Sequence, residues 1–132
     1  MGKIGVFIYN GFQEMEFWYP VLRLREVGAE VVVIGVDGSE AAASVLGYPV
    51  VPNVAMAQAS PSEFAALIVP GGNITKLADN TAFGNFLREA ASKRVRIAAA
   101  SQAVAFAPDA LVAHTTDDVP LWTRKLLEEL SQ

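Results

Sequence analysis

The stretch IAAASQAVAFA, from Ile97 to Ala107, decides the fold, because a short apolar run in it ends at the polar pair Ser101 and Gln102 and a second apolar run follows. This pattern predicts a buried strand that turns sharply into a helix. Strands followed by helices are the units of parallel sheets. In such sheets ligands bind beyond the carboxyl ends of the strands, where Ser101 would lie.

The rest of the chain repeats the alternation. Apolar, β-branched runs bounded by Gly, Pro, Asp or Lys predict strands covered on both faces, at Ile4–Tyr9, Val31–Val36, Leu67–Val69 and Val95–Ala100. Helical patterns occupy Glu14–Val27, Thr75–Ser92 and Val119–Leu130. Leu46–Val51 predicts a short strand or hairpin. We therefore expect an α/β fold with an open, doubly wound parallel sheet.

The composition predicts one domain over residues 1–132, without a membrane span. A chain of 132 residues can bury about two thirds of its unfolded surface in one core. Its apolar runs are broken well before the roughly 20 residues that a membrane-spanning helix needs. The N-terminal MGKIGVFIYNG fits neither a secretion signal nor a myristoylation site, so a cytoplasmic location is expected.

Charge and residue usage exclude several classes of function. Ten Lys and Arg against fourteen Asp and Glu give a net charge of −4, which argues against a nucleic-acid partner. With no Cys and one His, we expect no disulfide, no thiolate and no metal site, since any metal would have to be held by carboxylates alone. No cofactor is expected, since YNGFQEMEF lacks the glycines of a dinucleotide loop and its two glutamates would repel a phosphate.

Four segments should share the carboxyl edge of the sheet: Asn10–Glu16, Pro70–Asn73, Ala100–Ala103 and His114–Asp118. Glu16 lies in a helix that is apolar nearly all round, so we expect its carboxyl group to be partly buried and either protonated or hydrogen-bonded.

Other residues on this edge have simpler interpretations. Glu14 fits a favourable acid near a helix N-terminus. The pair Gly71 and Gly72 forms either a tight turn or a pair of free N–H groups for an oxyanion. Asn73 fits a helix N-cap region.

Three stretches together resemble the DJ-1/PfpI (ThiJ) superfamily: GFQEMEFWYPVLRLREVGAEVVVIG, FAALIVPGG and RIAAASQA. The resemblance implies a flavodoxin-like, three-layer α/β/α core related to the class I glutamine amidotransferases. It assigns Glu16 to the carboxylate that hydrogen-bonds the nucleophile, Gly72 to a backbone N–H of the oxyanion pocket, and Ser101 to the position of the nucleophilic cysteine.

The chain departs from the family pattern at two places. Ser101 and Gln102 replace the cysteine and its neighbour, and only APDA separates the elbow from the strand-like Leu111–Ala113, where the family carries several dozen residues and a histidine. A serine hydroxyl needs a base, and His114 is the single candidate, with Asp117 or Asp118 to orient it.

Two functions follow as hypotheses. The first is a degenerate, non-cysteine member that binds a small molecule or serves a stress-related role, with Gly71, Gly72, Asn73 and Gln102 as binding residues. The alternative is a hydrolase or acyl-transfer enzyme with Ser101 as nucleophile and His114 as base.

The first helix also predicts an oligomer. It carries more apolar side chains than packing on one sheet requires, so a homodimer is expected. The resemblance implies the same, because members of the family commonly dimerise near this helix.

Overall fold

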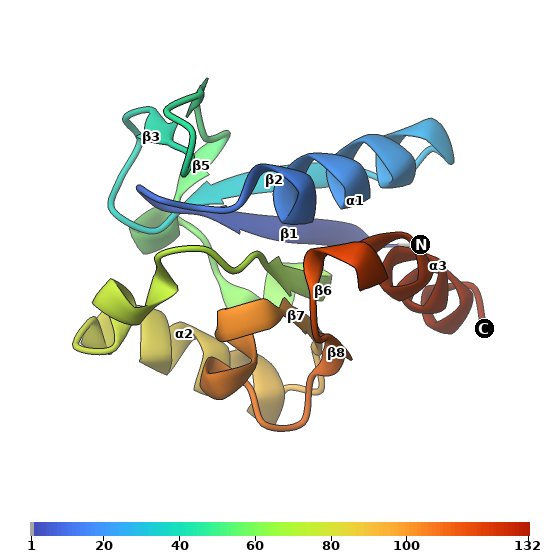
Figure 1. Cartoon of the computed structure of the whole chain (residues 1–132). Helices are drawn as coiled ribbons and strands as arrows, with labels where there is room; N and C mark the ends of the chain where they lie inside the picture. Colours follow the sequence, from blue (N-terminus) through green and yellow to red (C-terminus); the bar gives the residue numbers. More distant parts are fainter. Residues whose placement is uncertain (1) are drawn as a thin grey trace.

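The computed structural model describes residues 2–132 and contains a six-stranded sheet in the order β5-β2-β1-β6-β7-β8. Every neighbouring pair in this sheet is parallel. Helices α1 and α3 lie on one face and α2 lies on the other (Figure 1). The predicted doubly wound, three-layer α/β/α fold of the flavodoxin type is confirmed.

The elements have the following bounds. The strands are β1 Lys3–Ile8, β2 Val31–Gly35, β3 Ala42–Ala43, β4 Pro49–Val50, β5 Val54–Ala55, β6 Phe64–Val69, β7 Arg96–Ala100 and β8 Leu111–Ala113. The α-helices are α1 Glu14–Glu26, α2 Thr81–Ser92 and α3 Val119–Leu130. Short 3-10 helices are η1 Met56–Gln58, η2 Pro61–Glu63, η3 Ile74–Leu77, η4 Ser101–Phe106 and η5 Thr116–Asp118.

The core lies between the sheet and its two helical layers. On the α2 side, the ring of Phe7 meets Phe83 and Phe86 edge to face, with centroids 5.3 and 5.6 Å apart. Such contacts add to the free energy gained by burying the rings. On the other face, α1 buries an apolar stripe and packs against α3. The sheet is thus covered on both sides, as its apolar strands require.

Two expected helices differ from the structure. The range Thr75–Ser92 divides into η3 and α2, because Asn80 caps a new helix: its side chain accepts the Phe83 N–H at 2.9 Å. The helix expected after Ser101 is only the 3-10 helix η4. Pro108 follows closely, and a proline disfavours helical backbone at the residue before it.

An edge strand and part of a hairpin also differ from the prediction. The two-residue β5 pairs with β2, in a region where no strand was expected. The hairpin pairs β3 with β4, so its first strand precedes the predicted range Leu46–Val51.

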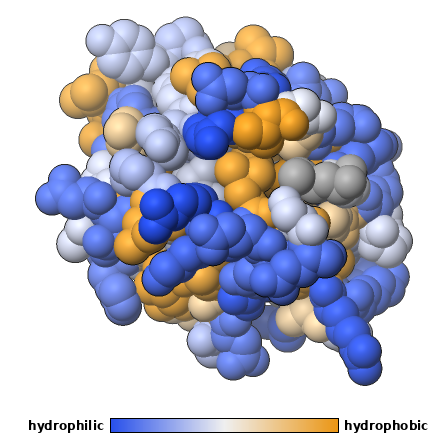
Figure 2. Space-filling model, turned by 90° about the vertical axis from the view of Figure 1, so that its right-hand side faces the viewer, coloured by the Kyte–Doolittle hydropathy of each residue, from blue (hydrophilic) through white to orange (hydrophobic). Residues whose placement is uncertain are grey.

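The surface is mixed. In the view onto the ends of α1 and α3, hydrophilic residues cover most of the face and hydrophobic ones emerge between them (Figure 2). Among the helices within residues 2–132, none is long and apolar enough to cross a membrane.

Candidate functional site

The site lies where the strand order changes direction, between β1 and β6. The loop after β1 meets the turn after β6 there, through an isolated bridge between Phe12 and Gly72. The Gly72 backbone has φ +112°, and a Cβ on it would come 2.3 Å from the Gly11 carbonyl oxygen, so only glycine fits. A switch point of this kind is where open parallel sheets bind ligands.

Glu16 is the buried carboxylate of the site. It belongs to the first turn of α1, whose N-cap Gln13 accepts the Glu16 N–H at 2.8 Å. Only 1% of the Glu16 surface is accessible to solvent. Leaving a carboxylate in such a place without partners would be costly.

Three donors meet the Glu16 carboxylate. The Gly71 N–H donates to Oε1 at 2.7 Å. The hydroxyls of Ser101 and Thr116 both donate to Oε2, at 2.7 and 2.9 Å. These donors follow β6, β7 and β8, so the carboxyl ends of three strands converge on one side chain. Hydrogen bonds to an ionised acceptor are the strong ones, and they offset the cost of burial.

Ser101 has an unusual backbone. Its φ of +50° lies in the left-handed region, where a side chain costs roughly 1–2 kcal/mol. The turn points Oγ at Glu16 and begins η4. Gly71 makes this close approach possible, because a Cβ there would lie 2.8 Å from Glu16 Oε1 and 3.0 Å from the Ser101 Cβ. Strain retained at such a position is typical of functional sites.

Tyr9 holds the turn after β6 in place. Its buried hydroxyl shares its single proton between the carbonyls of Pro70 and Gly71, whose oxygens lie 2.7 and 2.6 Å from it. Burial, and secondly the nearby Glu16 charge, raises the pKa of the Tyr9 phenol well above its usual value. The hydroxyl therefore remains a donor, and it fixes the two peptide units whose N–H groups, on Gly71 and Gly72, line the site.

The turn at Gly71 and Gly72 has fewer free N–H groups for an oxyanion than expected. The Gly71 N–H is used by Glu16, and the Gly72 N–H points to Gln102 Oε1 at a weak 3.5 Å. Asn73 is exposed, and its N–H donates to the Gly11 carbonyl at 2.9 Å. One N–H group, on Gly72, is therefore left for a ligand oxygen.

His114 lies beside Ser101 without bonding to it. Both residues line an open hollow together with Gln102, Thr115 and Thr116. Within residues 2–132, no hydrogen bond joins His114 to Ser101 or to either nearby aspartate. The Asp118 carboxylate instead accepts the Thr115 N–H at 3.2 Å, as part of a helix cap.

Glu14, two residues from Glu16, has a structural role. Its carboxylate accepts the Leu46 N–H at 2.7 Å and so ties the β3–β4 hairpin to α1. Partial burial opposes ionisation, but hydrogen bonds from Ser44 and Leu46 outweigh it and lower the pKa of Glu14.

Thr116 and Tyr9 take part in the site, although neither was predicted from the sequence. Thr116 lies within a segment assigned to the sheet edge, yet nothing in its type set it apart from its neighbours. Tyr9 ends an expected strand, where a polar tip on a buried ring is a usable signal. Across the described chain, no group of three acidic or histidine side chains could hold a metal ion.

Comparison with known proteins gives a consistent result. Residues 2–128 match the profile of the DJ-1/PfpI family. A deglycase of Thermococcus kodakarensis is 32% identical over 75 residues, which are 57% of this chain and 45% of that protein. Protein dj-1beta of Drosophila melanogaster is 30% identical over 111 residues, 83% of this chain and 57% of its own.

Solved structures agree. A cysteine-to-alanine mutant of a DJ-1 superfamily protein from Salmonella typhimurium has a TM-score of 0.88 at 20% identity, over 98% of this chain and 90% of that one. Drosophila DJ-1beta has a TM-score of 0.75 at 28% identity, over 80% and 57%. The chain spans about half the length of the curated relatives it matches.

Proposed function

This chain belongs to the DJ-1/PfpI family, and from that premise we propose that its site binds a small polar molecule without using Ser101 as a nucleophile. The observation that carries the proposal is the direction of the Ser101 hydroxyl, which donates to Glu16 Oε2 at 2.7 Å. Here Ser101 takes the position of the family's cysteine, and the site is a degenerate, non-cysteine one.

The chemistry of serine supports binding over turnover. A thiol is readily deprotonated beside a helix end or a cation, whereas a serine hydroxyl needs a strong, well-placed base. The group that accepts the Ser101 hydrogen bond is the Glu16 carboxylate, which also accepts from Gly71 and Thr116. That arrangement holds the hydroxyl in place and makes it a poor nucleophile.

The hydrogen-bond directions also define the ligand. Because the hydroxyls of Ser101 and Thr116 give their single protons to Glu16, their free lone pairs can only accept from a ligand. The Gly72 N–H, weakly held by Gln102, is a donor. A neutral compound that carries a hydroxyl or amide N–H beside a carbonyl oxygen complements this set, while a carboxylate would face the Glu16 charge.

Thermal unfolding tests the proposal. Hydroxyacetone, which has both groups, should raise the melting temperature, whereas acetate at equal concentration and ionic strength should not. At ten times its dissociation constant, a ligand adds about 1.4 kcal/mol of stability. A fluorophosphonate probe should leave Ser101 unlabelled. Stabilisation by acetate alone, or labelling of Ser101, would contradict the proposal.

The second candidate is a hydrolase or acyl-transfer enzyme with Ser101 as nucleophile and His114 as base. Two observations favour it: both residues line one hollow, and the left-handed Ser101 backbone is typical of a nucleophile on a sharp strand-to-helix turn. Fluorophosphonate labelling that disappears in His114→Ala would establish this candidate in place of the first.

We also infer that the chain forms a homodimer through α1 and the β3–β4 hairpin. Part of the α1 apolar surplus is buried against the sheet, but Met15 and Leu22 stay 43% and 57% exposed. Leu46, at the hairpin, is 74% exposed and lies next to the first turn of α1 through its bond to Glu14. A second copy that covers these side chains would remove an apolar patch from water.

A further inference from the structure

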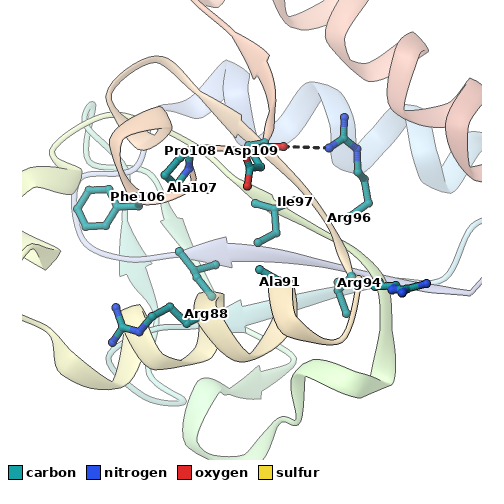
Figure 3. A pocket seen from close by; sticks show the side chains of 12 residues that line it. Arg88, Ala91, Arg94, Arg96, Ile97, Phe106, Ala107, Pro108 and Asp109 are labelled. Atoms are coloured by element: carbon teal, nitrogen blue, oxygen red, sulfur yellow. Dashed lines mark hydrogen bonds between the residues drawn. The ribbon is translucent and has the colours of Figure 1, made fainter.

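A second hollow lies on the α2 face, away from the carboxyl edge of the sheet. It has a volume of about 330 Å³ and is formed by α2, the start of β7 and the loop from η4 to β8 (Figure 3). Its apolar lining includes Leu87, Ile97 and Phe106. The hollow exists because η4 is a short 3-10 helix, so no full helix covers the sheet beside α2.

Three arginines surround this apolar hollow: Arg88, Arg94 and Arg96. Arg96 is neutralised, since its guanidinium binds both Glu129 oxygens at 2.7 and 3.3 Å. Arg88 donates only to the neutral Asn85 side chain, and no salt bridge to Arg88 or Arg94 exists within residues 2–132. In Figure 3 these two side chains extend to opposite ends of the hollow. Within the described residues, the rim thus carries two guanidinium groups without an ion pair against one carboxylate, that of Asp109, an excess of one positive charge in a chain of net charge −4.

Arg94 also occupies a backbone position that favours glycine. It follows the C-cap of α2 with φ +62°. The Val95 and Arg94 N–H groups donate to Ala90 and Ala91 at 2.9 and 3.1 Å, which is the Schellman motif that usually has glycine in the Arg94 position. An arginine without a carboxylate partner, kept at a strained position on the edge of a hollow, points to a use for its charge.

We propose that this hollow binds a small amphipathic anion, with an apolar body on the lining and a carboxylate at Arg94. Pockets of 300–1,000 Å³ with apolar linings and a few polar groups are typical of small-molecule sites, and a cavity of about 150 Å³ already holds benzene. A body of roughly eight to ten carbon atoms therefore matches the hollow. The proposal rests on none of the residues around Ser101.

The charges favour this ligand over a second copy of the chain. A second copy that covered the hollow would bury both unpaired guanidinium groups. It would therefore have to place one carboxylate at each end of the hollow to pair with them. A single small anion needs one contact, because the long Arg94 side chain can swing over the mouth. Surface arginines keep their charged heads in water until such a partner binds.

Calorimetric titration with octanoate tests the proposal, with backbone amide NMR shifts to locate the site. Octanoate should bind and shift the amides of Ala91, Ile97 and Phe106. Octan-1-ol, the matched uncharged chain, should bind more weakly. Arg94→Gln should weaken octanoate about three- to fivefold, the effect of one exposed ion pair. The control Lys125→Gln, which removes an exposed charge on α3, should have no effect.

Ala91→Trp, which places an indole into the hollow from α2, should abolish binding. Equal affinity for octan-1-ol, equal effects of Arg94→Gln and Lys125→Gln, or amide shifts around Ser101 would each overturn the proposal. A dimer that dissociates in Ala91→Trp, with no octanoate binding by the original chain, would show that a second copy fills the hollow. Should Ala91→Trp fail to fold, the octan-1-ol and Arg94→Gln comparisons still decide.

Discussion

Replacing Glu16 with glutamine should reverse the hydrogen-bonding role of the Ser101 and Thr116 hydroxyls toward a ligand. In Glu16→Gln, Oε1 still accepts the Gly71 N–H, but an NH₂ group faces the hydroxyls of Ser101 and Thr116 in place of Oε2. Both hydroxyls must then accept from the amide, and each turns its proton outward. The preference of the site should change from ligands that donate to ligands that accept.

The stability change follows from the same three bonds. A hydrogen bond to a charged acceptor contributes about 1.5–3 kcal/mol and a neutral one about 0.5–1.5, so the three bonds, each of which loses a charged partner, lose about 3 kcal/mol together. Relief from burying a charge offsets part of this loss. We expect Glu16→Gln to lower the free energy of unfolding by about 1–2 kcal/mol.

Urea unfolding measures this loss, and thermal shifts measure the ligand preference. Glu26→Gln is the matched control, since it removes a carboxylate from the same helix that is 73% exposed and forms only a surface ion pair with Arg23. It should change stability by less than about 0.5 kcal/mol. Unchanged stability in Glu16→Gln, with hydroxyacetone still preferred over acetate, would refute the assignment of three donors to Glu16.

Four further outcomes are expected. Tyr9→Phe should lower stability by about 1–2 kcal/mol at neutral pH. Because the pKa of Tyr9 is raised in the folded state, above about pH 10 the phenol loses its proton only on unfolding, and the original chain should lose up to about 1.4 kcal/mol of stability per pH unit. Urea unfolding at several pH values should find this slope reduced in Tyr9→Phe but not in Tyr48→Phe. Arg94→Gly should raise stability by about 1 kcal/mol through relief of its positive φ, and an equal gain in Arg94→Ala would count against that cause. Ser101→Cys should give a thiol that peroxide oxidises, seen by mass spectrometry, but no turnover of methylglyoxal; turnover would show that a cysteine suffices here. Leu22→Glu should shift sedimentation from dimer to monomer, and a monomeric original chain would exclude the interface.

The central strands could be predicted because both of their faces are buried. Runs such as Ile4–Ile8 and Ile97–Ala100 are apolar throughout, and such runs identify strands of parallel sheets. The two-residue strand β5 has no such run, since its pairing with β2 depends on where the chain returns to the sheet edge. Short edge elements are decided by tertiary contacts that no local pattern contains.

The meeting of Glu16 and Ser101 could also be anticipated, because Glu16 follows β1 and Ser101 follows β7 at the same edge of the sheet. The directions of the hydrogen bonds could not. They depend on the left-handed turn at Ser101 and on the position of Gly71, both of which are set by packing across the sheet. The predicted location in the cytoplasm stays a prediction.

The return of the chain after β8 explains why Thr116, and not His114, reaches the carboxylate. Ala113 pairs with Ala100, so His114 and Ser101 leave the sheet at the same level on neighbouring strands. The cap between Thr115 and Asp118 then folds the next residues into η5, which turns Thr116 inward and leaves His114 exposed. A hydroxyl can share Glu16 with Ser101 as a second donor, whereas a neutral imidazole there could have taken the serine proton. The cap between Thr115 and Asp118 thus brings a threonine to a place where a base would have favoured catalysis, which supports the proposal that the site binds a ligand without turnover.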